Sequence, residues 1–149
     1  MPLPQPKLGL VVHYGFVWAG TGRRPPPDAG KSRPCLIVDL DSTSEPAIGG
    51  RSILRITYLP ISHVPPRTGE QALPIPPRVA QHLGLTQQAS FLYTSYAVED
   101  DWPFDLDSIP GEPGRFDYGF IPPRLFAAVA ADFAAYLAAR PGMVQRRQD

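Results

Sequence analysis

Several features are scarce in this sequence, and each scarcity excludes a class of protein. Cys35 is the single cysteine, which excludes an intrachain disulfide and a cysteine-based zinc site and suits a reducing cytoplasm. No apolar run is long enough to cross a membrane, and the N-terminal segment MPLPQPKLGL lacks the apolar core of a signal peptide. We therefore expect a cytoplasmic protein without membrane contact.

An excess of charge is also missing, because 14 basic residues balance 14 acidic ones. This balance argues against a large, non-specific nucleic-acid binder. The charge is nevertheless uneven: residues 1–67 hold eight basic and four acidic residues, whereas residues 99–117 hold seven acidic residues and one arginine. A positive N-terminal half could bind a polyanion, although uneven surface charge is also common without function.

Proline is abundant, with 20 residues in 149, well above the usual ~5 %. Short strands and irregular loops fit this composition better than long helices, and the chain length suits one domain. Runs of β-branched and aromatic residues predict strands at residues 8–18, 33–40, 51–62, 70–75 and 89–98. A short helical turn at 76–85 and a helix at 122–140 follow from apolar spacing and flanking Pro and Gly. We predict a mainly β fold, a small and strongly bent β-barrel over about 8–98, then an acidic loop at 99–117, the C-terminal helix and a frayed tail at 141–149.

The segment Gly30-Lys31-Ser32 resembles the end of a phosphate-binding loop, but the rest of that motif is missing. The first glycine of such a loop would fall at position 25, which is Pro25, and proline offers no N–H to a phosphate. A strand also follows the segment where a helix is required. A nucleotide-binding P-loop is therefore excluded, and Lys31 needs another explanation.

Three residues at strand ends could carry chemistry. If the second and third strands are antiparallel neighbours, Arg33 at the start of one lies beside Ser62 and His63 at the end of the other. Arginine grips phosphate, histidine exchanges protons near neutral pH, and serine can donate to a phosphoryl oxygen. Structural readings stay open: a surface salt bridge for the arginine and a turn for the Ser-His pair. His13 and His82 favour structural or exposed roles.

These residues need neither metal nor cofactor if the substrate is RNA. No cluster of carboxylates with histidine lies near them, so a hard-metal site is not indicated. The 2′-OH of RNA is a built-in nucleophile. The protein then needs a base, an acid and a positive clamp on the transition state.

The order of motifs resembles the PemK/MazF-like toxins of type II toxin–antitoxin systems. The similar segments are GLVVHYGFVW from Gly9, the long basic loop, RPCLIV, LPISH, and the ending YGFIPPRLFAAV. The resemblance implies an SH3-like barrel, a homodimer, metal-independent cleavage of single-stranded RNA to a 2′,3′-cyclic phosphate, and a cognate antitoxin. It also implies that Arg33 takes the place of the family's RNA-contacting arginine and Ser62 that of its Thr/Ser.

Three hypotheses follow. The first is an endoribonuclease toxin in which Arg33, Ser62 and His63 are catalytic and Lys31, Arg23 and Arg24 hold the RNA backbone. In this hypothesis Trp102 stacks on a base, although a role in anchoring its loop is the alternative. The second is a non-catalytic SH3-like module that binds nucleic acid or protein. The third treats the acidic stretch 99–117 as a lid that competes with RNA for the basic loop.

Overall fold

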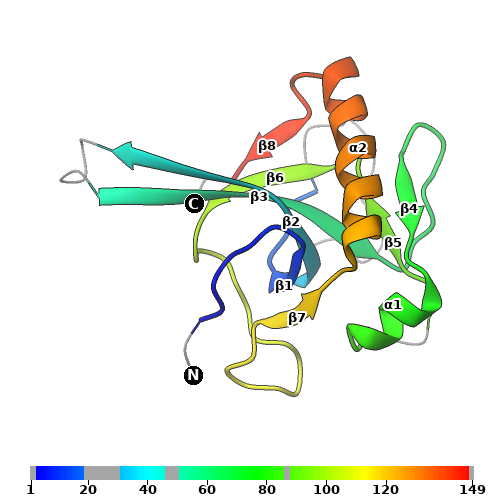
Figure 1. Cartoon of the computed structure of the whole chain (residues 1–149), viewed down its shortest axis with the longest axis horizontal. Coiled ribbons are helices and arrows are strands. Elements are labelled where there is room, and N and C mark those ends of the chain that lie inside the picture. Colours follow the sequence, from blue (N-terminus) through cyan, green and yellow to red (C-terminus); the bar gives the residue numbers. More distant parts are fainter. Residues whose placement is uncertain (1–2, 19–30, 46–50, 86–87, 148–149) are drawn as a thin grey trace.

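The protein is a mainly antiparallel β-sheet with a C-terminal helix, seen in a computed structural model that describes residues 3–18, 31–45, 51–85 and 88–147 (Figure 1). Its elements, in chain order, are β1 (Leu10–Tyr14), β2 (Arg33–Glu45), β3 (Arg51–Ser62), β4 (Ala72–Pro74), α1 (Pro77–His82), β5 (Phe91–Tyr93), β6 (Ala97–Asp101), β7 (Asp117–Phe120), α2 (Pro123–Ala139) and β8 (Val144–Arg146).

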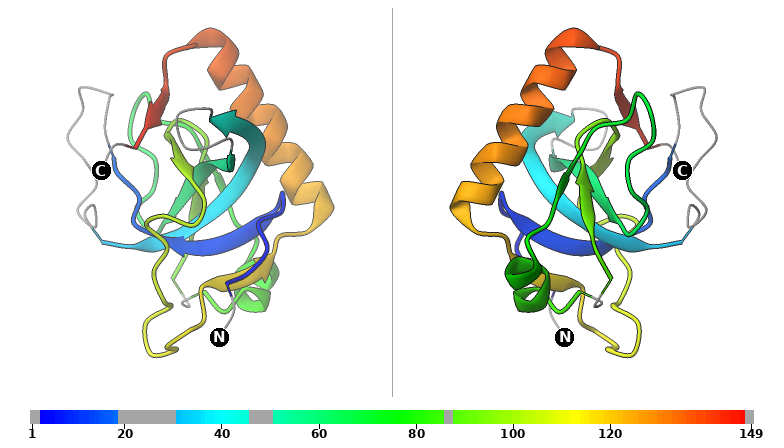
Figure 2. Two further views of the ribbon diagram at one scale, coloured as in Figure 1. Left: turned by 90° about the vertical axis from the view of Figure 1, so that its left-hand side faces the viewer. Right: turned by 90° about the vertical axis from the view of Figure 1, so that its right-hand side faces the viewer.

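The strands form one hydrogen-bonded path in the order β4-β5-β3-β2-β1-β7, and β6 pairs with both β3 and β8. On the side of β3 away from β2, residues 55–58 pair with β6, whereas Ile61 and Ser62 pair with β5. Among the described strands only β6 and β8 run parallel to each other, and the path does not close. The sheet curves strongly, and α2 crosses one of its faces (Figure 2).

Alternating side chains on the central strands build two apolar clusters on opposite faces. On β1, Leu10, Val12 and Tyr14 face one cluster, and Val11 faces the other. The cluster that contains Val11 also contains Ala80 of α1, Leu83 directly after it, and Val129 and Phe133 of α2. A strand that is buried on both faces carries mostly apolar side chains, as β1 does apart from His13. No helix in the described ranges is long and apolar enough to span a bilayer.

The register of β2 against β3 places the predicted site. Cys35 pairs with Pro60 and Leu36 with Leu59, so Arg33, two residues before Cys35, lies level with Ser62. The predicted strand at 51–62 is confirmed with both ends, and the predicted helix at 122–140 becomes α2 at Pro123–Ala139. In Figure 1 the other ends of β2 and β3 extend beyond the body of the protein as a long hairpin.

Several predicted boundaries are wrong. The strand predicted over 33–40 runs on to Glu45, the strand predicted over 70–75 covers only Ala72–Pro74, and the helical turn predicted over 76–85 covers only Pro77–His82. The first strand, predicted over 8–18, ends at Tyr14, and the predicted strand at 89–98 is two strands, β5 and β6. The acidic stretch 99–117 contains the end of β6 and the first residue of β7. The C-terminal tail is not frayed, because Ala97 and Val98 of β6 pair with Val144 and Gln145 of β8.

A polar network ties the acidic stretch to the centre of the sheet. The Tyr14 hydroxyl donates to Asp100 at 2.7 Å, and its ring stacks on Tyr58 at 4.0 Å between centroids. Asp105 forms an ion pair with Arg147 at 2.9 Å, and the Gly15 N–H donates to the Asp105 carbonyl. Burial and the neighbouring Asp105 carboxylate raise the pKa of Asp100 to about 7. This network fixes the chain just after β1, beside the predicted site.

We expect Leu36→Ala to lower the free energy of unfolding by about 2–5 kcal/mol, because Leu36 is fully buried and its removal leaves a cavity. Leu8→Ala is the matched control, since Leu8 is 49 % exposed, and its effect should stay within about 0.5 kcal/mol. Urea denaturation followed by tryptophan fluorescence measures both. Equal effects of the two substitutions would contradict the assignment of Leu36 to the core.

Because the pKa of Asp100 is raised in the folded protein, we expect the free energy of unfolding to depend on pH. The folded protein holds this proton more tightly than the unfolded chain, so the contribution of Asp100 to stability falls as pH rises from about 4 to about 7. Asp100→Asn should therefore gain stability relative to the wild type across this window, with a constant difference above it. Chemical denaturation at pH 4, 5.5, 7 and 8 measures the difference. A difference that does not change between pH 4 and pH 8 would contradict the raised pKa.

Candidate active site

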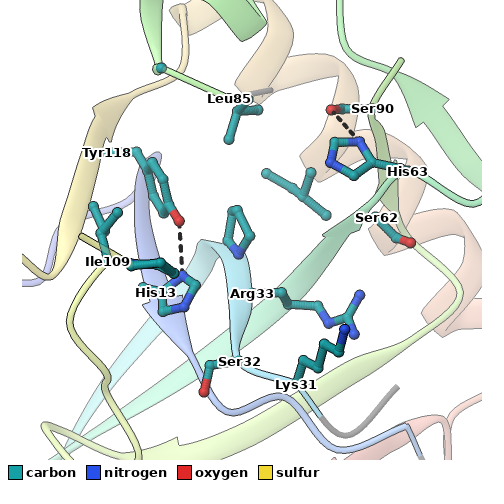
Figure 3. A pocket seen from close by; sticks show the side chains of 14 residues that line it. His13, Lys31, Ser32, Arg33, Ser62, His63, Leu85, Ser90, Ile109 and Tyr118 are labelled. Carbon is teal, nitrogen blue, oxygen red and sulfur yellow. Dashed lines mark hydrogen bonds between the residues drawn. The ribbon is translucent and has the colours of Figure 1, made fainter. Parts of the chain in front are cut away.

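A cavity of about 340 Å³ lies where β1, β2 and β3 end near one another (Figure 3). Some of its lining residues are buried and others are exposed, so the cavity opens to solvent. The lining residues are His13, Lys31, Ser32, Arg33, Pro34, Ile61, Ser62, His63, Gly84, Leu85, Ser90, Ile109, Pro110 and Tyr118. The structure thus brings together four of the residues predicted from sequence: Lys31, Arg33, Ser62 and His63.

Arg33 is a cation in an almost fully buried position. It begins β2, is 4 % exposed, and places its guanidinium over the Trp18 ring, 5.0 Å from the ring centroid. Trp18 is held edge-on by Tyr93 and Tyr96, at 5.5 and 4.8 Å between centroids. Cation–π contact offsets part of the cost of burying the charge. The aromatic residues therefore fix the guanidinium at the wall of the cavity.

Ser62 and His63 stand at the end of β3, on the other side of β2 from β1. The Ser62 Oγ accepts the Val64 N–H at 3.1 Å, so the hydroxyl also shapes the turn after the strand. His63 Nδ1 lies 3.0 Å from the Ala89 carbonyl and 3.4 Å from the Ser90 Oγ. A carbonyl only accepts, so the proton of His63 sits on Nδ1. Proton exchange with a ligand would then use Nε2.

His13 and Tyr118 were not predicted as site residues, yet both line the cavity. His13 Nδ1 lies 2.8 Å from the Tyr118 hydroxyl, and His13 is 5 % exposed. Burial lowers the pKa of His13; Asp107 opposes this shift and Arg33 adds to it. Burial raises the pKa of Tyr118 to about 12, so the phenol keeps its proton. The burial of His13 excludes the predicted exposed role and fits the predicted structural one, and His13 also lies on the cavity wall.

The acidic stretch is built into the wall of this region. Ser32 donates to Asp107 in a short hydrogen bond, and the Asp107 N–H donates to the His13 carbonyl at 3.0 Å. Three further carboxylates of the stretch contact arginines among the described residues: Glu99 and Asp101 contact Arg55 and Arg146, and Glu112 contacts Arg115. These contacts make the stretch a structural part of the sheet edge. Residues 19–30 of the basic loop lie outside the described residues, so the lid hypothesis stays a prediction.

The other predicted RNA-binding residues lie elsewhere. Arg23 and Arg24 fall outside the described residues. Trp102 follows β6, where its N–H donates to the Leu54 carbonyl at 2.8 Å, and its half-buried ring packs on the cluster that includes Tyr14. It does not line the cavity, and this packing fits the alternative role of loop anchor. A stacking role for Trp102 stays a prediction.

The described ranges hold no group of three or more His, Cys, Asp or Glu side chains placed to bind a metal ion. A scan against family models finds no match to the chain. Searches of curated proteins and of solved structures find no match either.

The environment of His13 predicts its protonation state. We expect NMR titration of the imidazole to give a pKa below the ordinary 6.5, because burial disfavours the cation. The unfolded chain binds this proton more tightly, so the His13 contribution to stability is lost as pH falls below about 6.5. A His13 pKa at or above 6.5 would contradict its burial as a neutral group.

Proposed function

We propose that this protein is a metal-independent endoribonuclease that cleaves single-stranded RNA by attack of the 2′-OH on the adjacent phosphate. The observation that carries the proposal is the cavity that gathers Arg33, Ser62, His63 and Lys31. A cation, a hydroxyl and a proton-exchanging imidazole are what this reaction asks of a protein, because RNA supplies the nucleophile itself.

In this reaction Arg33 binds the scissile phosphate and stabilises the charge that develops on its oxygens. The guanidinium lies in a partly water-excluded site, where its interaction with an anion is stronger than in bulk water. The exposed Lys31 at the same cavity contacts a neighbouring phosphate of the RNA backbone. Arg23 and Arg24 belong to the same basic loop in the sequence and extend this contact.

His63 exchanges a proton with the substrate through Nε2, because its Nδ1 proton is directed at the Ala89 carbonyl. That bond holds the imidazole in one orientation in both of its charge states. Ser62 orients the phosphate by donating to a phosphoryl oxygen. The products are a 2′,3′-cyclic phosphate and a 5′-hydroxyl.

The resemblance to PemK/MazF-like toxins completes the proposal. On this basis the curved sheet is an SH3-like barrel, the protein acts as a homodimer in the cytoplasm, and a cognate antitoxin blocks it. Messenger RNA is the expected target. The strand order and the terminal helix are compatible with this fold.

One observation favours a second candidate function. Arg33 is 4 % exposed and packs on Trp18, as a purely structural arginine also would. The second candidate is a non-catalytic SH3-like module that binds nucleic acid or protein through the same cavity. The two candidates differ in whether RNA is cut.

We expect the wild type to cut a long natural RNA in EDTA into discrete fragments with 2′,3′-cyclic phosphate ends. Arg33→Ala should lose about 10²–10³-fold in rate, because one preorganised donor to the transition state is removed. Arg33→Lys should lose less, since it keeps the charge without the bidentate fork. Arg124→Ala is the matched control, an exposed arginine on α2 outside the cavity.

Circular dichroism of each variant separates loss of chemistry from loss of fold. Cleavage by Arg33→Ala at the wild-type rate would reject the assignment of the site. A folded wild type that does not cut RNA would favour the binding module, and an RNA-binding titration would then test that candidate.

A further inference from the structure

His13 and His63 stand on opposite sides of the cavity, and the Arg33 guanidinium lies on a third side, near Lys31 (Figure 3). The strand order separates the two histidines: His13 lies on β1, His63 directly follows β3, and β2 runs between these strands. An in-line displacement at phosphorus has its attacking and leaving oxygens on opposite sides of the phosphate. Two proton-exchanging groups on opposite walls fit that geometry.

The position of His13 is built by several contacts that do not involve the apolar core. Its backbone N–H donates to the Phe116 carbonyl at 2.8 Å, and its carbonyl accepts the Asp107 N–H. The pairing of β7 with β1 shifts here, since Val11 pairs with Gly119 but Val12 pairs with Asp117. Tyr118 is therefore the extra residue of a β-bulge, and Gly119 adopts a φ of 99° beside it. Bulges redirect side chains, and this one directs the Tyr118 hydroxyl at His13.

The Tyr118 contact leaves Nε2 as the nitrogen through which His13 can meet a ligand. The base role requires the tautomer in which Nδ1 carries the proton and donates it to the phenol oxygen, because Nε2 then has a lone pair that can accept a proton. The charged groups that act on the imidazole are Asp107 and Arg33, and Lys31 lines the same cavity. Burial and Arg33 keep the ring neutral, as a base must be before it reacts.

We infer that His13 is the general base of the reaction and that His63 is its general acid, an assignment that rests on the proposed function. His13 Nε2 takes the proton of the 2′-OH while O2′ forms its bond to phosphorus. The P–O5′ bond breaks, its electron pair goes to O5′, and the His63 imidazolium donates a proton to that oxygen. Tyr118 is a positioning residue that holds the Nδ1 proton of His13.

The test compares two substrates that carry the cleavage site mapped in the long RNA. One has the natural O5′, and the other has sulfur at this position, whose thiolate leaves without protonation. On the oxygen substrate, His63→Ala and His13→Asn should each lose about 10²–10⁴-fold in rate. On the sulfur substrate, His63→Ala should return to near the wild-type rate, whereas His13→Asn should not.

Matched variants distinguish a loss of catalysis from a loss of folding. His13→Asn keeps an N–H near the Nδ1 position for Tyr118 but has no Nε2, so its loss reports on that nitrogen. His82→Ala, an exposed histidine on α1, should cut both substrates like the wild type. Tyr118→Phe should cause a smaller loss than His13→Asn and shift the acidic limb of the pH–rate profile, which a purely structural role would not do.

The outcomes separate this inference from the proposed function. If the wild type cuts and Arg33→Ala does not, but His13→Asn cuts normally, His13 is not the base and the proposed function stands. Recovery of His13→Asn on the sulfur substrate would also overturn the assignment, since it would make His13 the acid. If the folded wild type cuts neither substrate, both the function and the inference are rejected.

Discussion

The antiparallel pairing of β2 with β3 is the constraint on which the candidate site depends. Because Cys35 pairs with Pro60, Arg33 must lie level with Ser62, and His63 must follow at the same edge. The pairing of β1 with β2 adds His13, which lies opposite Pro34. A slip of one residue in either register would turn these side chains to the other face of the sheet. The apolar clusters on both faces prevent such a slip, so the core of the protein fixes the chemistry at its edge.

The burial of Arg33 is the costly feature of this arrangement. A guanidinium removed from water loses hydration that a surface arginine keeps, and the Trp18 ring returns only part of it. A well-packed apolar residue at the start of β2 would satisfy the fold more simply. The same low-dielectric setting strengthens the attraction between the guanidinium and an anion in the cavity. The feature is easier to understand as a binding device than as a source of stability.

Much of the architecture follows from local sequence signals. The third strand and the terminal helix are predicted almost to the residue, because β-branched alternation and flanking prolines mark them clearly. The juxtaposition of Arg33 with Ser62 also follows, since it needs only that two successive strands pair. The parallel pairing of β8 could not be predicted, because a three-residue strand has no pattern of its own. Its partner β6 lies more than forty residues away, and the ion pairs of Arg147 and Arg146 help to hold it.

The sequence did not predict that His13 lines the cavity, and the reason is physical. Side chains in the strand LVVHY point alternately to the two faces of the sheet, and the local sequence does not show which face His13 occupies. Its partner Tyr118 lies on a short strand that the acidic, Pro- and Gly-rich sequence conceals, and it faces His13 only because of a bulge. Bulges depend on tertiary pairing more than on local sequence. One sequence signal could have pointed to His13 and Tyr118: a polar residue, His13, within an otherwise apolar strand that pairs with the strand of Arg33.

The His13–Tyr118 hydrogen bond joins residues 105 positions apart in the chain. Contacts of such long sequence separation form late in folding, because the intervening chain must lose its freedom before they can contribute. Arg33 and Ser62 can meet as soon as the β2–β3 hairpin forms, but the opposite wall of the cavity waits for β7. A growing or partly folded chain would therefore hold an anion-binding edge without the second histidine in place. Under the proposed function, the chain would lack a complete site until β7 has paired with β1.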